Sequence, residues 1–195
     1  MRGAFVVIEG IDGAGGTTHS KMLSDWMRER GLKVILTSEP TDGKIGSLIR
    51  DYLKTGGSHP AIDALLFAAD RIEHTERIKN MLEEGFFVVS DRYVESSIAY
   101  QTAEGLDLDW VIEVNKFAIK PDVTIILDLP EDVALERLKG RSYKEKFERK
   151  EFLKKVREIY LKRAKENGYF IIDSTKSLNE VQREIREIIV KKFGI

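Results

Sequence analysis

Hydrophobic positions along this chain fall into two alternating kinds of segment. Five short apolar runs are rich in β-branched residues and do not alternate apolar with polar positions: 4–9, 33–38, 86–91, 123–129 and 169–173. Strands of this kind are buried on both faces, as in a parallel sheet. The segments between them carry the longer period of helices, at 17–30, 44–54, 60–84, 94–118, 131–138, 150–166 and 177–193.

Strand and helix therefore alternate over the whole chain, which predicts an α/β fold: a doubly wound, five-stranded parallel sheet flanked by helices. No linker rich in Pro, Ser or Gly divides the 195 residues, so residues 1–195 are predicted to form a single domain. The one break in composition is the charged segment KGRSYKEKFERKE at 139–151. By composition alone it is a solvated loop; a short lid over a ligand is the alternative.

Composition and charge narrow the function classes. The chain has 32 Lys and Arg residues and 33 Asp and Glu residues, so it has no net positive charge that would favour binding of nucleic acid. The chain has no cysteine, which excludes disulfides and thiolate metal sites and predicts a cytoplasmic protein. The apolar run at its start is too short for a signal peptide or a membrane span. Three histidines, with no metal-ligand spacing, are predicted to be surface residues.

A glycine-rich loop follows the first predicted strand in EGIDGAGGTTHS, residues 9–20. Strand, glycine turn and helix form the context of a phosphate loop, in which backbone N–H groups and a helix N-terminus face phosphate oxygens. Thr17 is placed to offer its hydroxyl to Mg²⁺. We expect the nucleotide to contact the following residues of the loop: Gly10, Gly13, Ala14, Gly15, Gly16, Thr17 and Thr18.

Gly16 occupies the position at which G-x-x-x-x-G-K-[ST] has lysine. An ammonium near a phosphate contributes a few kcal/mol at an effective dielectric of about 20. Losing one preorganised donor lowers a rate by about 10²–10³. The sequence therefore predicts that nucleotide binding survives on backbone amides and Mg²⁺, whereas turnover falls unless another cation takes that place.

Five motifs, in order and spacing, resemble the thymidylate kinase family over nearly the whole chain: IEGIDGAGGTT, SEPTDGKIG, LLFAADR, SDRYVESSIAYQ and KFERKEFLKKVREIYLKRA. The resemblance implies a P-loop core with strand order 2-3-1-4-5, a homodimer, and Mg²⁺-dependent transfer of the ATP γ-phosphate to dTMP, which gives dTDP. The helical region 94–118 is expected to supply the subunit contact. The charged segment becomes the lid.

The resemblance also assigns roles to single residues. Arg137 packs on adenine, and Asp91 holds Mg²⁺ together with Thr17. Phe67 stacks on thymine and Arg71 donates to a base carbonyl, while Tyr100 crowds the 2′ position of the sugar. The catalytic residues are implied to be Asp12, Arg92, Arg141 and Lys146. The acceptor nucleotide is implied to contact Asp12, Glu39, Pro40, Arg50, Phe67, Arg71, Arg92, Ser97, Tyr100 and Gln101.

Two departures from the family pattern keep alternatives open. Ser38 stands where an arginine commonly precedes Glu-Pro, and Lys146 where many relatives have arginine. Together with Gly16, these departures leave other interpretations open. In one, the chain is a nucleotide-binding protein with little turnover. In another, Gly16 is a change introduced into an ordinary kinase. A kinase for a different pyrimidine deoxynucleotide, such as dUMP, is the third.

Overall fold

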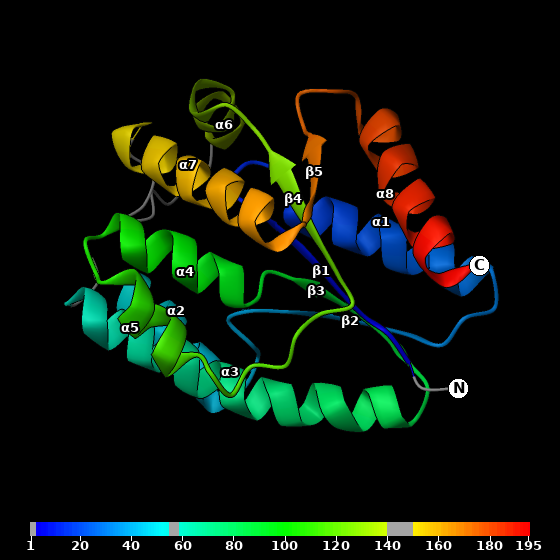
Figure 1. Cartoon of the computed structure of the whole chain (residues 1–195), viewed down its shortest axis with the longest axis horizontal. Helices are drawn as coiled ribbons and strands as arrows, with labels where there is room; N and C mark the ends of the chain where they lie inside the picture. The colour runs from blue at the N-terminus through cyan, green and yellow to red at the C-terminus, as the bar shows by residue number, and fades with distance from the viewer. Residues whose placement is uncertain (1–2, 55–58, 140–149) are drawn as a thin grey trace.

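Five parallel strands form one sheet, in the order β2-β3-β1-β4-β5 (Figure 1). The structure is a computed structural model that describes residues 3–54, 59–139 and 150–195. The strands are β1 (Phe5–Gly10), β2 (Val34–Ser38), β3 (Phe87–Asp91), β4 (Val123–Asp128) and β5 (Phe170–Asp173). The predicted doubly wound α/β fold and its strand order are confirmed.

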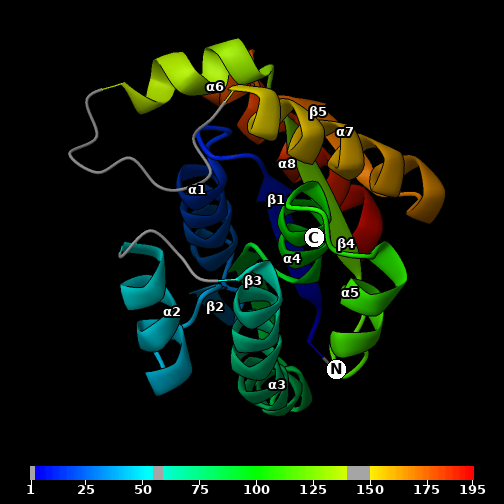
Figure 2. The ribbon, with the colours of Figure 1, turned by 90° about the vertical axis from the view of Figure 1, so that its left-hand side faces the viewer.

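Helices cover both faces of the sheet (Figure 1). One face carries α1 (Gly16–Glu29) and α8 (Leu178–Phe193). The other carries α3 (Pro60–Glu83), α4 (Val94–Ala103) and α7 (Lys150–Asn167). Three further helices pack on this second group: α2 (Lys44–Lys54) and α5 (Leu108–Val114) against α3, and α6 (Glu131–Leu138) against α7 (Figure 2).

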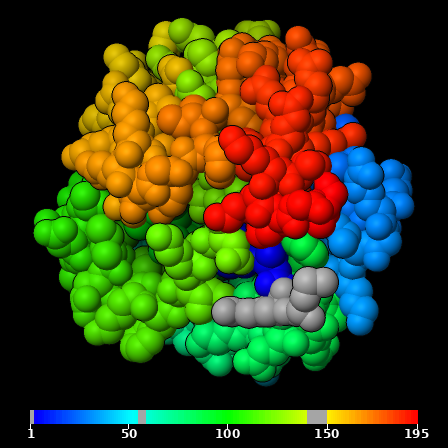
Figure 3. All heavy atoms as spheres, turned by 45° about the vertical axis from the view of Figure 1, so that its right-hand side comes forward, coloured from blue at the N-terminus to red at the C-terminus, as the bar shows by residue number. Residues whose placement is uncertain are grey.

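Burial differs between the inner and the edge strands. Every residue of β1 is buried, as are the first five of β4, whereas β5 buries only Ile172. The expectation that all five runs are buried on both faces is therefore wrong for the edge. Edge strands have a neighbour on one side only, and β5 leaves Phe170 and Ile171 partly exposed although both α8 and α7 contact it. Figure 3 shows α7 (orange) and α8 (red) side by side on this face of the molecule.

The region 94–118 is two helices rather than one continuous helical segment. Gly105 has a φ of +101°, a left-handed conformation that stops α4 at Ala103. Asp107 then begins α5, because its side chain accepts the Trp110 N–H as an N-cap. The break turns the chain and lets α5 pack on both α3 and α4.

The strand ends bring the predicted motifs to one edge of the sheet. Gly10 ends β1 and Asp91 ends the neighbouring β3, with Ile8 opposite Asp91 in the register. The chain leaves β1 for α1 on one face and leaves β3 for α4 on the other, so a crevice opens between these strand ends. In the part of the chain that the structure describes, no helix is long and apolar enough to cross a membrane.

Candidate active site

The turn between β1 and α1 encloses a cavity of about 410 Å³, which we call the loop cavity. Gly13 and Gly15 have φ values of +86° and +96°, left-handed conformations that glycine adopts without steric strain. The turn leads directly into α1, whose N-terminal N–H groups face the cavity. All eight predicted nucleotide-binding residues line it: Gly10, Gly13, Ala14, Gly15, Gly16, Thr17, Thr18 and Arg137.

Arg137 closes one side of the loop cavity through two backbone contacts. Its guanidinium donates to the carbonyls of Gly13, at 3.3 Å, and Ser174, at 2.8 Å. Ser174 in turn donates its hydroxyl to the Ala14 carbonyl, at 2.6 Å. The loop after β5 is thus part of this cavity, and sequence reasoning missed its lining residues Ser174, Lys176 and Leu178. Their position just after the last strand was the available signal.

Thr17 and Asp91, the two predicted metal-binding residues, lie next to each other. The Thr17 hydroxyl donates to Asp91 Oδ2 at 2.6 Å. A hydroxyl and a carboxylate are oxygen donors of the kind that Mg²⁺ takes, with substrate phosphates and water as its other ligands. Among residues 3–54, 59–139 and 150–195, no group of three His, Asp or Glu side chains is able to hold a metal by itself.

The absence of a side chain at position 16 leaves room for Asp91. A Cβ atom added to Gly16 would lie 2.5 Å from Asp91 Oδ1, far inside van der Waals contact. Any larger residue there therefore requires the Asp91 carboxylate to turn away. Since that carboxylate holds Thr17, a lysine at position 16 would disturb the Thr17–Asp91 pair as well as add a charge.

A second cavity, the inner cavity, adjoins the loop cavity and measures about 90 Å³. Nine of the ten predicted acceptor residues line it: Asp12, Glu39, Pro40, Phe67, Arg71, Arg92, Ser97, Tyr100 and Gln101. Sequence reasoning missed Leu53, Tyr93 and Ser96. Two of its lining atoms, Ser97 Oγ and Gln101 Oε1, are buried without a hydrogen-bond partner among the described residues. Buried polar atoms normally have partners, so a ligand that supplies them fits this cavity.

Arg50, the tenth predicted acceptor residue, does not line the inner cavity. Its guanidinium donates to the carbonyls of Pro40, at 3.1 Å, and Thr41, at 2.8 Å. Arg50 therefore supports the loop that carries Glu39 and Pro40.

Asp12 and Arg92 line both cavities and form an ion pair at 2.6 Å. The Tyr100 hydroxyl donates to Asp12 Oδ2 at 3.0 Å, and the Arg92 guanidinium lies over the Tyr100 ring. Burial alone would lower the pKa of Arg92, but Tyr100 and Asp12 hold it well above its ordinary value. Arg92 is thus a fixed positive charge between the two cavities.

Glu9 supports Arg92 from beneath. Its carboxylate accepts the backbone N–H of Tyr93, at 2.8 Å, and the hydroxyls of Ser96, at 2.6 Å, and Tyr160, at 3.1 Å. Arg92 donates to the same Ser96 oxygen, at 3.0 Å. Burial is the main reason that the pKa of Glu9 rises to about 7, against the lowering effect of Ser96 and Arg92. Glu9 thus connects β1, α4 and α7.

The histidines are not all surface residues, and that prediction is wrong for two of them. His19 and His74 are buried, and His59 alone is exposed, where its ring caps the start of α3. His19 Nδ1 lies 2.9 Å from the Gln182 side-chain amide, and its ring packs on the phosphate loop at Gly15. Burial, aided by Arg137, lowers the pKa of His19 to about 4, so the ring is neutral at physiological pH.

The lid residues stay predictions. Arg141 and Lys146, expected to be catalytic, lie outside the described residues, as does most of the segment 139–151. On either side of them, α6 ends at Leu138 and α7 begins at Lys150.

Known proteins resemble this chain over nearly its whole length. A family model described as thymidylate kinase matches residues 8–185. A probable thymidylate kinase of Thermococcus gammatolerans is 48% identical over 203 residues, with 98% of each chain covered. One from Pyrobaculum aerophilum is 48% identical over 188 residues, covering 95% of this chain and 96% of its own. A solved thymidylate kinase structure from Candida albicans matches at TM-score 0.82 and 27% identity, covering 97% and 92% of the two chains.

Proposed function

Since this chain belongs to the thymidylate kinase family, we propose that it transfers the γ-phosphoryl group of ATP to a phosphate oxygen of dTMP, which gives ADP and dTDP. The observation that carries this reaction is the pair of adjoining cavities that share Asp12 and Arg92. One cavity is built of backbone amides at a helix N-terminus, the other of aromatic, polar and guanidinium side chains. Two nucleotides held in them meet with their phosphates at Arg92.

ATP binds in the loop cavity, where the N–H groups of the loop and the start of α1 face its phosphates. Arg137 flanks the adenine, since it spans the loop and the segment after β5. Thr17 Oγ1 and the Asp91 carboxylate would hold Mg²⁺ with its phosphate and water ligands. When bound, Mg²⁺ neutralises charge on the β- and γ-phosphate oxygens.

dTMP binds in the inner cavity with its phosphate toward Arg92. Phe67 offers its ring to the base, a stacking contact that contributes about 1–3 kcal/mol. Arg71 Nη1 has two N–H groups, of which one binds Asn115, and we assign the other to the carbonyl at C4 of thymine. Cytosine has an amino group at C4 and would oppose this donor. Tyr100, held by Asp12, limits space at the sugar.

The chemistry needs alignment and positive charge rather than a general base, because the acceptor phosphate is already ionised. An acceptor oxygen attacks the γ-phosphorus in line, and the bond from that phosphorus to the β-phosphate bridging oxygen breaks. Arg92 can hold the acceptor phosphate with two parallel N–H groups, which reduces repulsion between the two polyanions. The lid cations Arg141 and Lys146 are the proposed substitutes for the missing loop lysine.

A homodimer remains part of the proposal. α3 exposes an apolar stripe of Ile62, Leu65 and Ile72, which are 44%, 52% and 42% accessible. Their spacing of three and seven residues places them on one face of the helix. Contiguous exposed apolar side chains mark interfaces more often than free surface. We therefore propose that the expected region 94–118, which exposes Ile112 and Phe117, supplies the subunit contact together with the neighbouring α3. We retain the cytoplasm as the expected location.

A coupled assay of ADP release with ATP, Mg²⁺ and a panel of dTMP, dUMP and dCMP tests the function. We expect turnover with dTMP as the preferred acceptor. A preference for dUMP would indicate another pyrimidine nucleotide kinase. Calorimetric binding of both ADP and dTMP without turnover would favour the nucleotide-binding alternative that Gly16 suggests, and no binding of dTMP would overturn the assignment of the inner cavity.

A further inference from the structure

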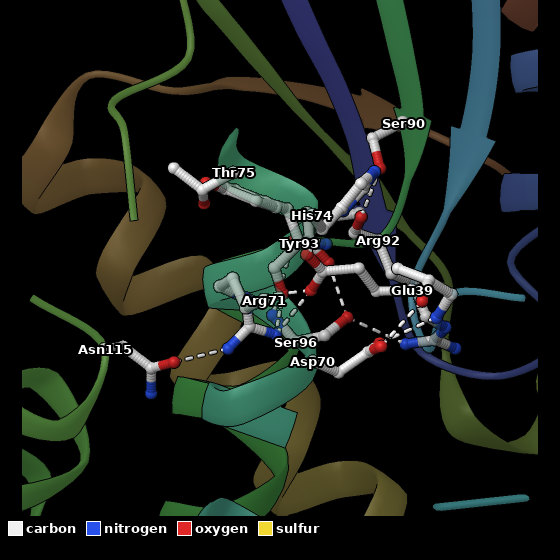
Figure 4. Close-up of polar contacts among 12 residues, drawn as sticks. Glu39, Asp70, Arg71, His74, Thr75, Ser90, Arg92, Tyr93, Ser96 and Asn115 are labelled. Atoms are coloured by element: carbon white, nitrogen blue, oxygen red, sulfur yellow. Dashed lines mark hydrogen bonds and ion pairs between the residues drawn. The ribbon is translucent and has the colours of Figure 1, made fainter. Parts of the chain in front are cut away.

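A buried chain of polar contacts leads from the inner cavity into the protein through Arg71, Glu39 and His74 (Figure 4). Arg71 donates its Nε–H to Glu39 Oε2 at 2.8 Å, and its Nη2 lies 2.6 Å from the same oxygen. Nη2 also donates to the Tyr93 carbonyl, and Nη1 to the Asn115 side chain. The Arg71 side chain is only 2% accessible, so these contacts set the orientation of its guanidinium.

The other carboxylate oxygen of Glu39 is held by His74. His74 Nδ1 lies 2.8 Å from Glu39 Oε1, and its Nε2 lies 2.8 Å from the Thr37 hydroxyl. A carboxylate only accepts hydrogen bonds, so the Nδ1 proton belongs to the histidine and is donated to Glu39. The two ends of the ring are thus anchored, one on β2 and one on the carboxylate.

Arg71 and His74 lie three residues apart on α3 and therefore on the same face of the helix. They contact opposite oxygens of the Glu39 carboxylate, and Glu39 lies just after the end of β2. A carboxylate held at one oxygen only can rotate about its last bond, whereas one held at both cannot. His74 therefore restricts the plane of Glu39, and Glu39 restricts the guanidinium of Arg71.

We propose that His74 is a positioning residue for base recognition: its Nδ1–H fixes Glu39 so that Arg71 presents Nη1 to the C4 carbonyl of the acceptor base. This inference rests on the proposed function of the inner cavity. His74 does not line that cavity, so it acts through Glu39, which it contacts, and through Arg71, which Glu39 holds. Its loss lowers the affinity for dTMP and the preference over dCMP, and leaves the phosphates at Arg92 aligned.

Other contacts hold the backbone of the loop that carries Glu39, so we expect this loop to stay folded when His74 is changed. Asp70 accepts the backbone N–H of Thr41 at 2.7 Å and its hydroxyl at 2.6 Å. Arg50 binds the carbonyls of the same loop. A change at His74 therefore frees the Glu39 side chain while its backbone stays in place.

The test compares three variants of the full chain in kcat and KM for dTMP and dCMP. His74→Leu removes both ring contacts, His74→Asn places an amide N–H where Nδ1 lies, and Ile78→Val removes buried volume one turn along α3. For His74→Leu we expect the KM for dTMP to rise about tenfold and the dTMP preference to fall about tenfold, with kcat changed less than about threefold. His74→Asn recovers most of the preference and Ile78→Val keeps it.

Equal selectivity in His74→Leu and the wild type overturns the inference while leaving the proposed function intact. Wild-type protein that neither binds nor phosphorylates dTMP overturns both. If His74→Leu fails to fold, His74→Asn against His74→Gln decides, because glutamine places its amide near Nε2 instead. Equal dTMP preference in those two variants would also overturn the inference.

Discussion

The loop cavity and the inner cavity adjoin each other but are built by different means. The loop cavity is about 410 Å³, made of backbone and small residues, and its side-chain cations are Arg92, Arg137 and Lys176 among the described residues. The inner cavity is about 90 Å³ and is lined by two ion pairs, Arg71–Glu39, which is buried, and Arg92–Asp12, which is half-buried. Backbone amides suit phosphates, which every nucleotide carries, whereas fixed side chains can distinguish one base from another. The main chain thus provides binding of phosphates in any nucleotide, whereas buried side chains provide selectivity for one base.

Arg92 belongs to both cavities, so its removal should have the largest effect. In Arg92→Ala we expect kcat with ATP and dTMP to fall about 10³-fold, because a preorganised charge between two polyanions is lost. Arg92→Lys should restore only part of the rate, since an ammonium lacks the planar fork of the guanidinium. Steady-state kinetics with ADP binding by calorimetry measures both effects. A loss below about tenfold in Arg92→Ala, with normal folding, would contradict the central place of Arg92.

Substitution of Glu9, which supports Arg92, tests whether its contribution to the free energy of unfolding depends on pH. Its pKa rises from 4.5 to about 7 on folding, which corresponds to about 3 kcal/mol. A raised carboxyl pKa favours the folded state below the unfolded pKa and loses that contribution as pH rises through 7. The wild type should therefore lose about 3 kcal/mol of unfolding free energy relative to Glu9→Gln between pH 4.5 and 8.

Urea denaturation of the two proteins across that pH range measures the difference. Glu76→Gln, a change of an exposed carboxylate paired with Lys79, is the control and should show no such trend. A difference between the wild type and Glu9→Gln that stays constant with pH would mean that folding does not raise the pKa of Glu9.

Substitutions of Gly16 test whether the missing lysine charge lowers turnover or whether another cation already replaces it. Gly16→Lys adds a cation, and we expect kcat to rise about 10²-fold, although the Asp91 carboxylate must turn to admit the side chain. Gly16→Ala adds only the Cβ and separates the steric effect from the charge; its kcat should stay at or below that of the wild type. A rise of only a few-fold in Gly16→Lys would indicate that lid cations already serve in its place.

Arg50 should give the smallest effect, because it reaches the inner cavity only through the Pro40–Thr41 backbone. We expect Arg50→Ala to raise the KM for dTMP by about threefold, the effect of one partly exposed hydrogen-bonded group. Initial-rate kinetics at saturating ATP provides the measurement. A rise of a hundredfold or more would show that Arg50 contacts the acceptor phosphate directly, as the family resemblance implied.

The sequence predicted the main features of the cavities because they depend on local pattern. Apolar runs and helical periods located the five strands and most helices, and the glycine spacing located the phosphate loop. The region 94–118 was an exception, since one left-handed glycine and one capping aspartate divide it. Such breaks depend on a few backbone angles that a hydrophobic period does not register.

The burial of His74 and His19 could not be predicted from the local sequence pattern. His74 has polar neighbours in the sequence, but the fold places it against Glu39, 35 residues away, and Thr37. His19 likewise meets Gln182 from the last helix, 163 residues along the chain. A polar residue is buried when distant partners satisfy its hydrogen bonds, and no single segment contains that information.

What the sequence determined alone is the alternation of strand and helix, the phosphate loop with glycine at position 16, and the set of side chains at the strand ends. What the tertiary structure decided is which of these side chains face a cavity and which hold another in place. Arg50 and Glu39 illustrate the difference: the family resemblance implied that both contact the acceptor, but Glu39 lines the inner cavity whereas Arg50 supports the Pro40–Thr41 backbone. The physical reason is that hydrophobic period is a property of a segment, whereas the orientation of a buried charge depends on partners from elements far apart in the chain.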